Sequence, residues 1–288
     1  MRKAASEEDM REMDSSVIEK TVERLCIKAN CVLPDDVRTC IERAAEAEPY
    51  EPARVILRQI IENYKIAEEE SVPICQDTGA ACVFLEIGQD VHVNGSIEEA
   101  VNRGVAAGYT KGYLRASMVA DPITRVNTGD DTPAFIYYDL VPGDRIKITV
   151  APKGYGSENM SRIKMLKPSD GVEGIIDFVM ETVLKAGPNP CPPIVVGVGI
   201  GGNFDKAALM AKKALLRPLD QPPADDMYGE LEQKLLEMIN STGMGPQGFG
   251  GRTYALAVNI EHCATHIAGL PAAVNINCHV TRHCSEVL

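Results

Sequence analysis

The chain has 288 residues, of which 45% are hydrophobic and 24% are charged, as in a globular protein that can bury a sizeable core. A net charge of −12 argues against nucleic-acid binding, because phosphate contacts require a basic face. The first ten residues lack an apolar run, and no stretch reaches the roughly 18 apolar residues of a membrane span. We therefore expect neither a signal peptide nor a membrane helix.

The first seventy residues predict a helical N-terminal subregion, 1–70. Asp14 can cap a helix that carries apolar residues at helical spacing over 17–26, and Pro34 and Asp35 suit the first turn of a second helix. A third helix is predicted over 51–70 from its apolar periodicity. The cysteines in or beside these helices are interpreted as small core residues: Cys26, Cys31 and Cys40.

Strands and helices alternate through the remainder of the chain. Strands are predicted over 80–85, 134–140, 145–150, 194–200, 254–260 and 272–276, with the second and third joined by a turn. Helices are predicted up to 107 and over 171–185, 205–216 and 228–239, and the glycine-rich stretch 243–251 is predicted to be a loop. The class is therefore α/β, with α+β left open, and the N-terminal helices are followed by a mixed sheet in a single domain over 1–288.

Three cysteines stand apart because each lies at the edge of a predicted strand. Cys75 begins the polar run Cys75-Gln76-Asp77-Thr78-Gly79 before the strand at 80–85, while Cys191 precedes the strand at 194–200 and Cys278 follows that at 272–276. Loops at strand ends are where ligands and nucleophiles tend to lie, so we expect the three thiols to serve one shared site. The odd number of cysteines, nine, without an export signal favours a reducing cytoplasm over a disulfide framework.

Two other patterns suggest different chemistry. The spacing Gly197-x-Gly199-x-x-Gly202 matches the dinucleotide fingerprint, but we expect no second parallel strand ending in a ribose-binding acid, so close strand-to-helix packing is the better interpretation. A non-catalytic zinc- or cluster-binding module is the alternative that the histidines and cysteines near the C-terminus leave open. Its candidate ligands, which lack Cys-x-x-Cys spacing, are His262, Cys263, His266, Cys278, His279, His283 and Cys284.

Four short segments together resemble the α-type subunit of iron–sulfur hydro-lyases, the class I fumarases and L-tartrate dehydratases. They are Cys75-Gln76-Asp77-Thr78-Gly79, Gly156-Ser157-Glu158-Asn159-Met160, Cys191-Pro192-Pro193 and the terminal Cys278. The chain is similar to this family from about Val17 to the C-terminus. The match is specific because several motifs coincide in order, although no single motif is specific by itself.

The resemblance implies a [4Fe–4S] cluster bound by Cys75, Cys191 and Cys278. Three thiolates leave one iron open, and that iron can act as a Lewis acid on the substrate's hydroxyl and carboxylate. Such an enzyme is expected to be sensitive to oxygen. One departure concerns the residues after the last cysteine, where many relatives carry an aromatic residue and two arginines. The roles of the residues found there instead are left open: His279, Arg282, His283 and Cys284.

The resemblance also implies a set of substrate and catalytic residues. It places Gln76, Asp77, Arg115 and Gly156 at the substrate, and Asp77 and His266 in the catalytic set. Structural alternatives exist for three of them. Asp77 can cap its own turn, Arg115 can be a surface cation, and His266 can be a hydrogen-bonded buried histidine.

The length of the chain implies a partner. Single-chain members of the class fuse this region to a second domain, and the chain stops where that domain would begin. We therefore expect an α subunit that is poorly active without a separate β subunit, in a heterotetramer or larger assembly. The loop 153–160 is closer to the fumarase pattern, so the expected reaction is the reversible hydration of fumarate to L-malate, as in the tricarboxylic acid cycle. Dehydration of L-tartrate is the alternative.

Overall fold

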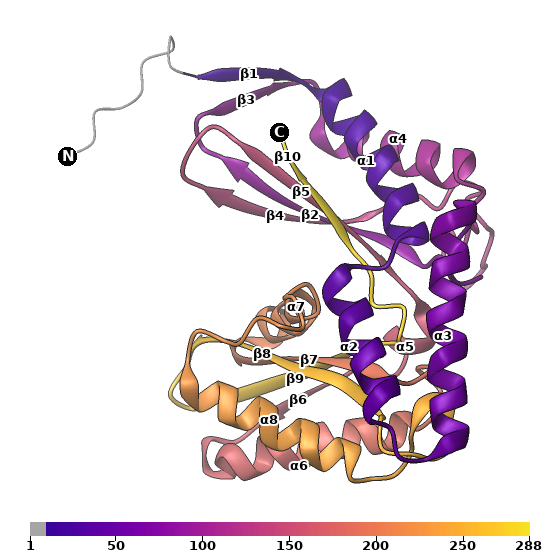
Figure 1. Cartoon of the computed structure of the whole chain (residues 1–288). Coiled ribbons are helices and arrows are strands. Elements are labelled where there is room, and N and C mark those ends of the chain that lie inside the picture. Colours follow the sequence, from indigo (N-terminus) through magenta and orange to yellow (C-terminus); the bar gives the residue numbers. More distant parts are fainter. Residues whose placement is uncertain (1–9) are drawn as a thin grey trace. The chain divides into compact units, whose positions relative to one another are not determined.

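The computed structural model describes residues 10–288, which divide into two compact units. Unit 1 is assembled from residues 10–33, Ile66–Lys153 and Arg282–Leu288, and unit 2 from Pro34–Lys65 and Gly154–Thr281. Each unit combines helices with a sheet, which confirms the α/β class (Figure 1). The single domain expected over 1–288 stays a prediction. No helix among residues 10–288 has both the length and the apolar character of a membrane span.

The main sheet of unit 1 has four strands in the order β10-β5-β2-β4. The central strand β2 (Ala80–Gly88) pairs in parallel with β4 (Phe135–Val141) and antiparallel with β5 (Ile146–Lys153). The outer edge of β5 carries β10 (Cys284–Val287), also antiparallel. The two strands predicted on either side of the turn at 141–144 therefore do not pair with each other, because both pair with β2.

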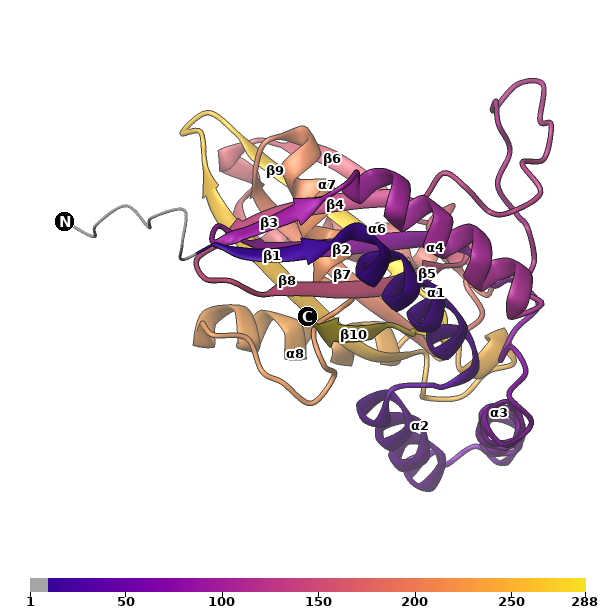
Figure 2. The same ribbon diagram turned by 90° about the horizontal axis from the view of Figure 1, so that it is seen from above.

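The described part of the chain enters unit 1 through a short strand. Strand β1 (Arg11–Asp14) lies beside and parallel to β3 (Val91–Asn94), as Figure 2 shows. Asp14 ends this strand and caps helix α1 (Ser15–Cys31) as predicted, since its carboxylate accepts the N–H of Ser16 over 2.9 Å. A strand thus precedes the helices predicted for 1–70, and residues 1–9 of that subregion lie outside the described residues.

The helices of unit 1 are held close together by glycine. Helix α4 (Ile97–Lys111) packs along α1. A Cβ atom on Gly104 would lie 2.5 Å from a carbonyl oxygen of α1, and one on Gly108 would lie 2.8 Å from the Cβ of Cys26. Neither distance is tolerated, so the two glycines fix how closely the helices approach.

The sheet of unit 2 has the strand order β6-β9-β7-β8. The strands are β6 (Arg162–Leu166), β7 (Ile194–Gly202), β8 (Ala255–Thr265) and β9 (Leu270–Asn277). Strand β9 is antiparallel to both β6 and β7, whereas β7 and β8 are parallel. The helices and 3-10 turns of this unit are α2 (Asp35–Ala47), most of α3 (Glu51–Glu70), α5 (Tyr155–Glu158), Pro168–Asp170, α6 (Gly171–Ala186), α7 (Phe204–Ala214), α8 (Asp226–Asn240) and Pro246–Gly248.

The alternation of side chains along β7 explains how helices cover both faces of this sheet. Ile194, Val196, Val198 and Ile200 face the core that includes α6 and α8, while α7 covers the opposite face (Figure 1). On the α7 face, a Cβ on Gly197 or Gly199 would lie about 2 Å from a carbonyl oxygen of α7.

The glycines of the fingerprint at 197–202 therefore serve close strand-to-helix packing, as predicted. One reason given for that prediction was wrong, because a second parallel strand, β8, does follow α7. The prolines and polar residues between α7 and α8 concealed it, since α8 and its flanking loops separate the helix from the strand.

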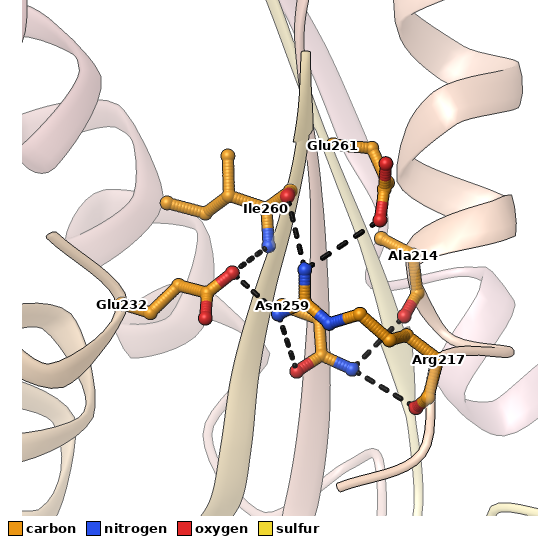
Figure 3. Close-up of polar contacts among 6 residues, drawn as sticks. All are labelled: Ala214, Arg217, Glu232, Asn259, Ile260 and Glu261. Carbon is orange, nitrogen blue, oxygen red and sulfur yellow. Dashed lines mark hydrogen bonds and ion pairs between the residues drawn. The ribbon is translucent and has the colours of Figure 1, made fainter. Parts of the chain in front are cut away.

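A buried ion pair joins the segment after α7 to α8 in unit 2, beside β8 (Figure 3). The guanidinium of Arg217 donates to the carboxylate of Glu232 over 2.5 Å, and each side chain is only 11% exposed. Arg217 also donates to the side-chain oxygen of Asn259 and the carbonyl of Ile260, while Glu232 accepts the N–H of Ile260 over 2.6 Å. Burial raises the pKa of Glu232, and the bonds from Arg217 and Ile260 work against that rise.

Candidate active site

The Cys75 loop lies in unit 1, directly before β2. Its backbone turns so that the N–H of Asp77 donates to the sulfur of Cys75 over 3.4 Å and the N–H of Gly79 donates to the Asp77 carboxylate over 3.1 Å. Gly79 has a φ of +70°, a left-handed conformation that glycine adopts without strain. Cys75 and Asp77 are half-buried and Gln76 is exposed. Asp77 therefore caps its own turn, as its structural alternative predicted, within the loop that carries Cys75.

Arg115 lies beside this loop. Its N–H donates to the hydroxyl of Thr78 over 2.9 Å, although 37 positions separate the two residues. The guanidinium is exposed, and it forms no hydrogen bond or ion pair with the residues from 10 to 288. Unit 1 thus brings together four of the predicted site residues: Cys75, Gln76, Asp77 and Arg115.

Two buried side chains hold the carbonyl groups of the same loop. The hydroxyl of Tyr109 lies 3.1 Å from the carbonyl oxygen of Thr78 and 2.9 Å from that of Gly79. Arg282 donates from Nη2 to the carbonyl oxygen of Asp77 over 2.7 Å. Sequence reasoning missed Tyr109, which occupies an apolar position of α4 and carries no motif, and it left the role of Arg282 open.

Cys191 and Cys278 lie at one end of the sheet in unit 2. Cys191 precedes β7 and Cys278 follows β9, and these antiparallel strands place Val195 opposite Asn277. The backbone N–H of His279 donates to the carbonyl of Cys191 over 3.3 Å, and Nδ1 of the same histidine lies 2.9 Å from that oxygen. The side-chain amide nitrogen of Gln247 lies 3.2 Å from the same Nδ1, so the tautomer of His279 decides which of the two contacts is a hydrogen bond.

Gly156 lies near the Cys191 loop. A Cβ on Gly156 would lie 3.8 Å from the carbonyl oxygen of Asn189, which itself lies 4.0 Å from the sulfur of Cys191. That separation is an ordinary contact, so packing within the chain does not require glycine at this position. Cys191 and Gly156 are exposed and Cys278 is half-buried. Unit 2 thus groups three predicted site residues: Gly156, Cys191 and Cys278.

His266 lies at the opposite end of unit 2's sheet. It is exposed in the turn between β8 and β9, where its Nδ1 accepts the N–H of Ala268 over 3.2 Å. Cys278 follows the other end of the eight-residue strand β9, whose length is roughly 25 Å at about 3.3 Å per residue. The structure therefore separates His266 from Cys191 and Cys278 within this unit.

The remaining cysteines are distinguished from the three loop thiols by their surroundings. All nine are free. Cys26 and Cys31 are buried, and burial raises the pKa values of their thiols and of Cys40, which keeps all three neutral. For Cys26 and Cys31 this confirms the prediction of small core residues. Cys284 belongs to β10, where it lies opposite Val150.

The alternative zinc ligands are not gathered at one place. His262 and Cys263 lie near the end of β8, with the His262 ring stacked on Tyr228 at a centroid distance of 4.0 Å. They share the end of the sheet that carries His266, opposite the end with Cys278. In the part of the chain that the structure describes, no three His, Cys, Asp or Glu side chains are grouped so as to hold a metal ion.

The chemistry of the three loop thiols fits an iron–sulfur ligand set. Each lies in a loop at a strand end and is at least partly accessible, unlike the buried Cys26 and Cys31. The sulfur of Cys75 already accepts a backbone N–H, the kind of bond that tunes cluster sulfurs.

Comparison with known proteins identifies the family. The model of the family described as "Fumarate hydratase (Fumerase)" matches residues 19–287, nearly the whole chain. The chain belongs to this fumarate hydratase family. The resemblance stated from the four sequence segments is therefore confirmed.

Similar proteins carry the name of one branch of the family. One from Methanocaldococcus jannaschii, whose name marks the assignment as provisional, is called L(+)-tartrate dehydratase subunit alpha and is 46% identical over 272 residues, covering 92% of this chain and 95% of its own. The L(+)-tartrate dehydratase subunit alpha of Escherichia coli (strain UTI89 / UPEC) is 34% identical over 254 residues, covering 87% and 84%. That of strain K12 is 33% identical over the same length. The names do not decide between fumarate and tartrate for this member of the family.

Proposed function

We propose that this chain is the α subunit of a two-subunit iron–sulfur hydro-lyase that acts on a four-carbon dicarboxylate in the cytoplasm. The observation that carries the proposal is the placement of Cys191 and Cys278 at one end of a sheet, in a chain whose family match spans 19–287. Cys75 supplies the third thiol. The assignment of all three thiols to one site is supported by the family match, which includes all three of their segments.

The bound cluster would supply a Lewis-acidic iron that polarises the substrate's hydroxyl. The exposed fork of Arg115 would bind a substrate carboxylate through two hydrogen bonds, and its positive charge would locally oppose the repulsion of an anion by a chain of net charge −12. Gln76, exposed next to Cys75, would donate to the substrate, and the exposed Gly156 would leave room for it.

Asp77 and His266 are proposed to hold or move a proton. Asp77 is already placed in the Cys75 loop. His266 lies at the other end of β9 from Cys278, so its role requires a contact made in the assembled enzyme. The relatives' names identify them as alpha subunits, which supports a separate β subunit here. We propose that this partner completes the site in a heterotetramer or larger assembly.

Two substrates have specific support. Fumarate, hydrated to L-malate, is supported by the family's description and by the pattern of the loop at 153–160. L-tartrate is supported at least as well by the names of relatives that cover nearly the whole chain. One additional hydroxyl on a substrate can be accommodated by small changes in a pocket, so both belong in the first assay.

The test is anaerobic co-expression with a candidate β chain, followed by measurement of iron, acid-labile sulfide and turnover of fumarate, L-malate and L-tartrate. We expect a brown complex with iron and sulfide that turns over at least one of these substrates and loses activity in air. A colourless protein with zinc, or a complex with full cluster and no turnover of any four-carbon hydroxy acid, would contradict the proposal.

A further inference from the structure

The Cys75 loop is held by an unusual arrangement of its carbonyl groups. Three consecutive carbonyl oxygens, those of Asp77, Thr78 and Gly79, are all bonded by buried side chains of unit 1. Arg282 donates to the carbonyl of Asp77, and the Tyr109 hydroxyl lies within hydrogen-bond distance of the carbonyls of Thr78 and Gly79. Loop carbonyls more commonly face water, so this loop is anchored at each of its last three residues.

Peptide geometry transmits this anchoring to the N–H groups. In a planar trans peptide the C=O and N–H point in opposite directions. The carbonyl of Thr78 faces Tyr109, so the N–H of Gly79, in the same peptide, points the other way and donates to the Asp77 carboxylate over 3.1 Å. The N–H of Asp77 in turn donates to the sulfur of Cys75 over 3.4 Å. That N–H belongs to the peptide of the Gln76 carbonyl, directly before the carbonyl that Arg282 holds, so Arg282 and Tyr109 fix the chain on the C-terminal side of the N–H···S contact.

Arg282 is a costly residue to bury for packing alone. It is 4% exposed, and its Nε is buried without a hydrogen-bond partner among the described residues. A charged guanidinium removed from water with one donor unsatisfied would be less stable than an apolar side chain of similar volume. Its burial here points to a contribution beyond packing, and it donates a hydrogen bond to the Cys75 loop.

A buried carboxylate lies in the same surroundings. Asp131 has no exposed surface; one oxygen accepts the N–H of Ser117 over 2.8 Å and the other has no partner within residues 10–288. Burial raises the pKa of Tyr109 far above its usual range, Asp131 raises it further, and Arg282 lowers it. Both charges are therefore close enough to act on the Tyr109 hydroxyl, with opposite sign.

We propose that Arg282 is a positioning residue for the Cys75 loop: its bond to the Asp77 carbonyl, together with the Tyr109 hydroxyl, fixes the turn in which the N–H of Asp77 faces the Cys75 sulfur. The consequence for a metal centre rests on the function proposed above. A loop fixed in this way retains an iron–sulfur cluster longer than a mobile one, and its N–H···S bond tunes the cluster.

The first test needs no cluster. Amide hydrogen exchange of the segment 74–79 is measured by mass spectrometry in the full chain without iron, for the parent, Arg282→Met, Arg282→Gln and Arg282→Lys. We expect exchange to be roughly tenfold faster or more in Arg282→Met, because a charged hydrogen bond is lost. Arg282→Lys, which retains charge and a donor, should recover part of the protection. Arg24→Met is the matched control, since Arg24 is an exposed arginine of the same unit that pairs with Glu286.

Unchanged exchange in a folded Arg282→Met variant would overturn the inference. If that variant does not fold, Arg282→Gln is compared with the parent instead, because it removes the charge while retaining a donor. Unchanged exchange in Arg282→Gln would then overturn the inference. Exchange must rise in the loop and not across unit 1, and the midpoint of urea unfolding measures any general loss of stability.

The second test uses the complex with the β chain, loaded anaerobically. The rate of iron release to a chelator should be at least tenfold higher in Arg282→Met at equal initial iron, with partial rescue in Arg282→Lys. A parent chain that binds no iron contradicts the proposed function and leaves the exchange experiment to decide on Arg282. A loaded variant with parental iron release contradicts the inference and leaves the proposed function intact.

Discussion

The N–H of Arg115 donates to the hydroxyl of Thr78 over 2.9 Å, and this bond places an exposed guanidinium beside the loop that begins at Cys75. Thr78 is 1% exposed and cannot move without the loop. The backbone of Arg115 is therefore fixed while its side chain stays free to bind an anion. That combination suits a residue that must recognise a carboxylate at a defined position.

Replacing Arg115 separates substrate binding from cluster assembly. Arg115→Ala should reduce catalytic efficiency by tens- to thousands-fold, the effect of losing a charged contact worth about 2–5 kcal/mol. Arg115→Lys retains the charge without the fork and should also be impaired. Iron content and the visible spectrum should match the parent in both variants. Unchanged turnover would make Arg115 a surface residue, and loss of iron would make its role structural.

Replacing the loop cysteines tests the ligand set. Cys75→Ser, Cys191→Ser and Cys278→Ser should each lose most of the bound iron, because three thiolates are needed to hold the cluster with one iron open. Cys40→Ser and Cys284→Ser are the controls and should retain it. Iron and sulfide are measured after anaerobic purification. Full iron in Cys191→Ser would remove this residue from the ligand set.

Asp131 predicts a pH dependence of stability. Burial raises its pKa from 3.8 to about 6, and the bond from the Ser117 N–H lowers it less. Between these values the folded chain binds a proton that the unfolded chain has released, so Asp131 lowers the free energy of unfolding as pH rises through this window. Across this window the free energy of unfolding falls by about 3 kcal/mol.

Asp131→Asn removes this dependence. The free energy of unfolding of the variant minus that of the parent should increase by up to about 3 kcal/mol between pH 4 and pH 7.5. Urea unfolding at both pH values measures it. Asp121→Asn is the control: bonds from Thr124 and Ile123 lower the pKa of Asp121 below 3.8, so its difference from the parent should change little between pH 4 and pH 7.5. A difference between Asp131→Asn and the parent that is independent of pH would contradict the prediction.

The pair of Arg217 and Glu232 predicts a compensation between two substitutions. Arg217→Met leaves Glu232 as a lone buried carboxylate and should lower the free energy of unfolding by about 3–5 kcal/mol. Adding Glu232→Gln removes the lone charge and retains an acceptor for the N–H of Ile260, so more than half of the loss should be recovered.

An exposed pair supplies the control for this compensation. Lys185 and Glu181 are 63% and 40% exposed, and Lys185→Met should cost less than about 1 kcal/mol. Urea unfolding measures each variant. A double variant of Arg217 and Glu232 that is less stable than Arg217→Met alone would show that the amide cannot replace the carboxylate.

Local patterns made the elements predictable from the sequence. Asp14 caps α1, α3 spans the predicted 51–70, and the apolar run after Gly79 is β2. The placement of Cys191 and Cys278 at strand edges could also be predicted from the sequence, because a cysteine next to an apolar run lies where a strand begins or ends. These features depend on neighbours in sequence, which is why periodicity and capping rules find them.

Features that depend on distant pairing were not predictable. Nothing near 134–150 indicates that β4 and β5 pair with β2 and not with each other, since that choice is made by the packing of the whole sheet. Nothing in the sequence distinguishes Tyr109 from the other residues near it, or Asp131 from other acidic residues in loops. Their roles arise from burial beside Arg282, a residue that the sequence places far away.

The pairing of β10 with β5 has a consequence for how the protein is made. The hydroxyls of Thr149 and Ser285 on these strands lie 2.7 Å apart, yet 136 positions separate them in the chain. A ribosome delivers β5 long before it delivers β10, with most of unit 2 synthesised in between. Throughout that interval the outer edge of β5 presents unpaired N–H and C=O groups, which invite pairing with other nascent chains. Slow elongation near the end of the message therefore prolongs a period of vulnerability to aggregation, and chaperones that shield an open sheet edge would raise the yield of folded chain.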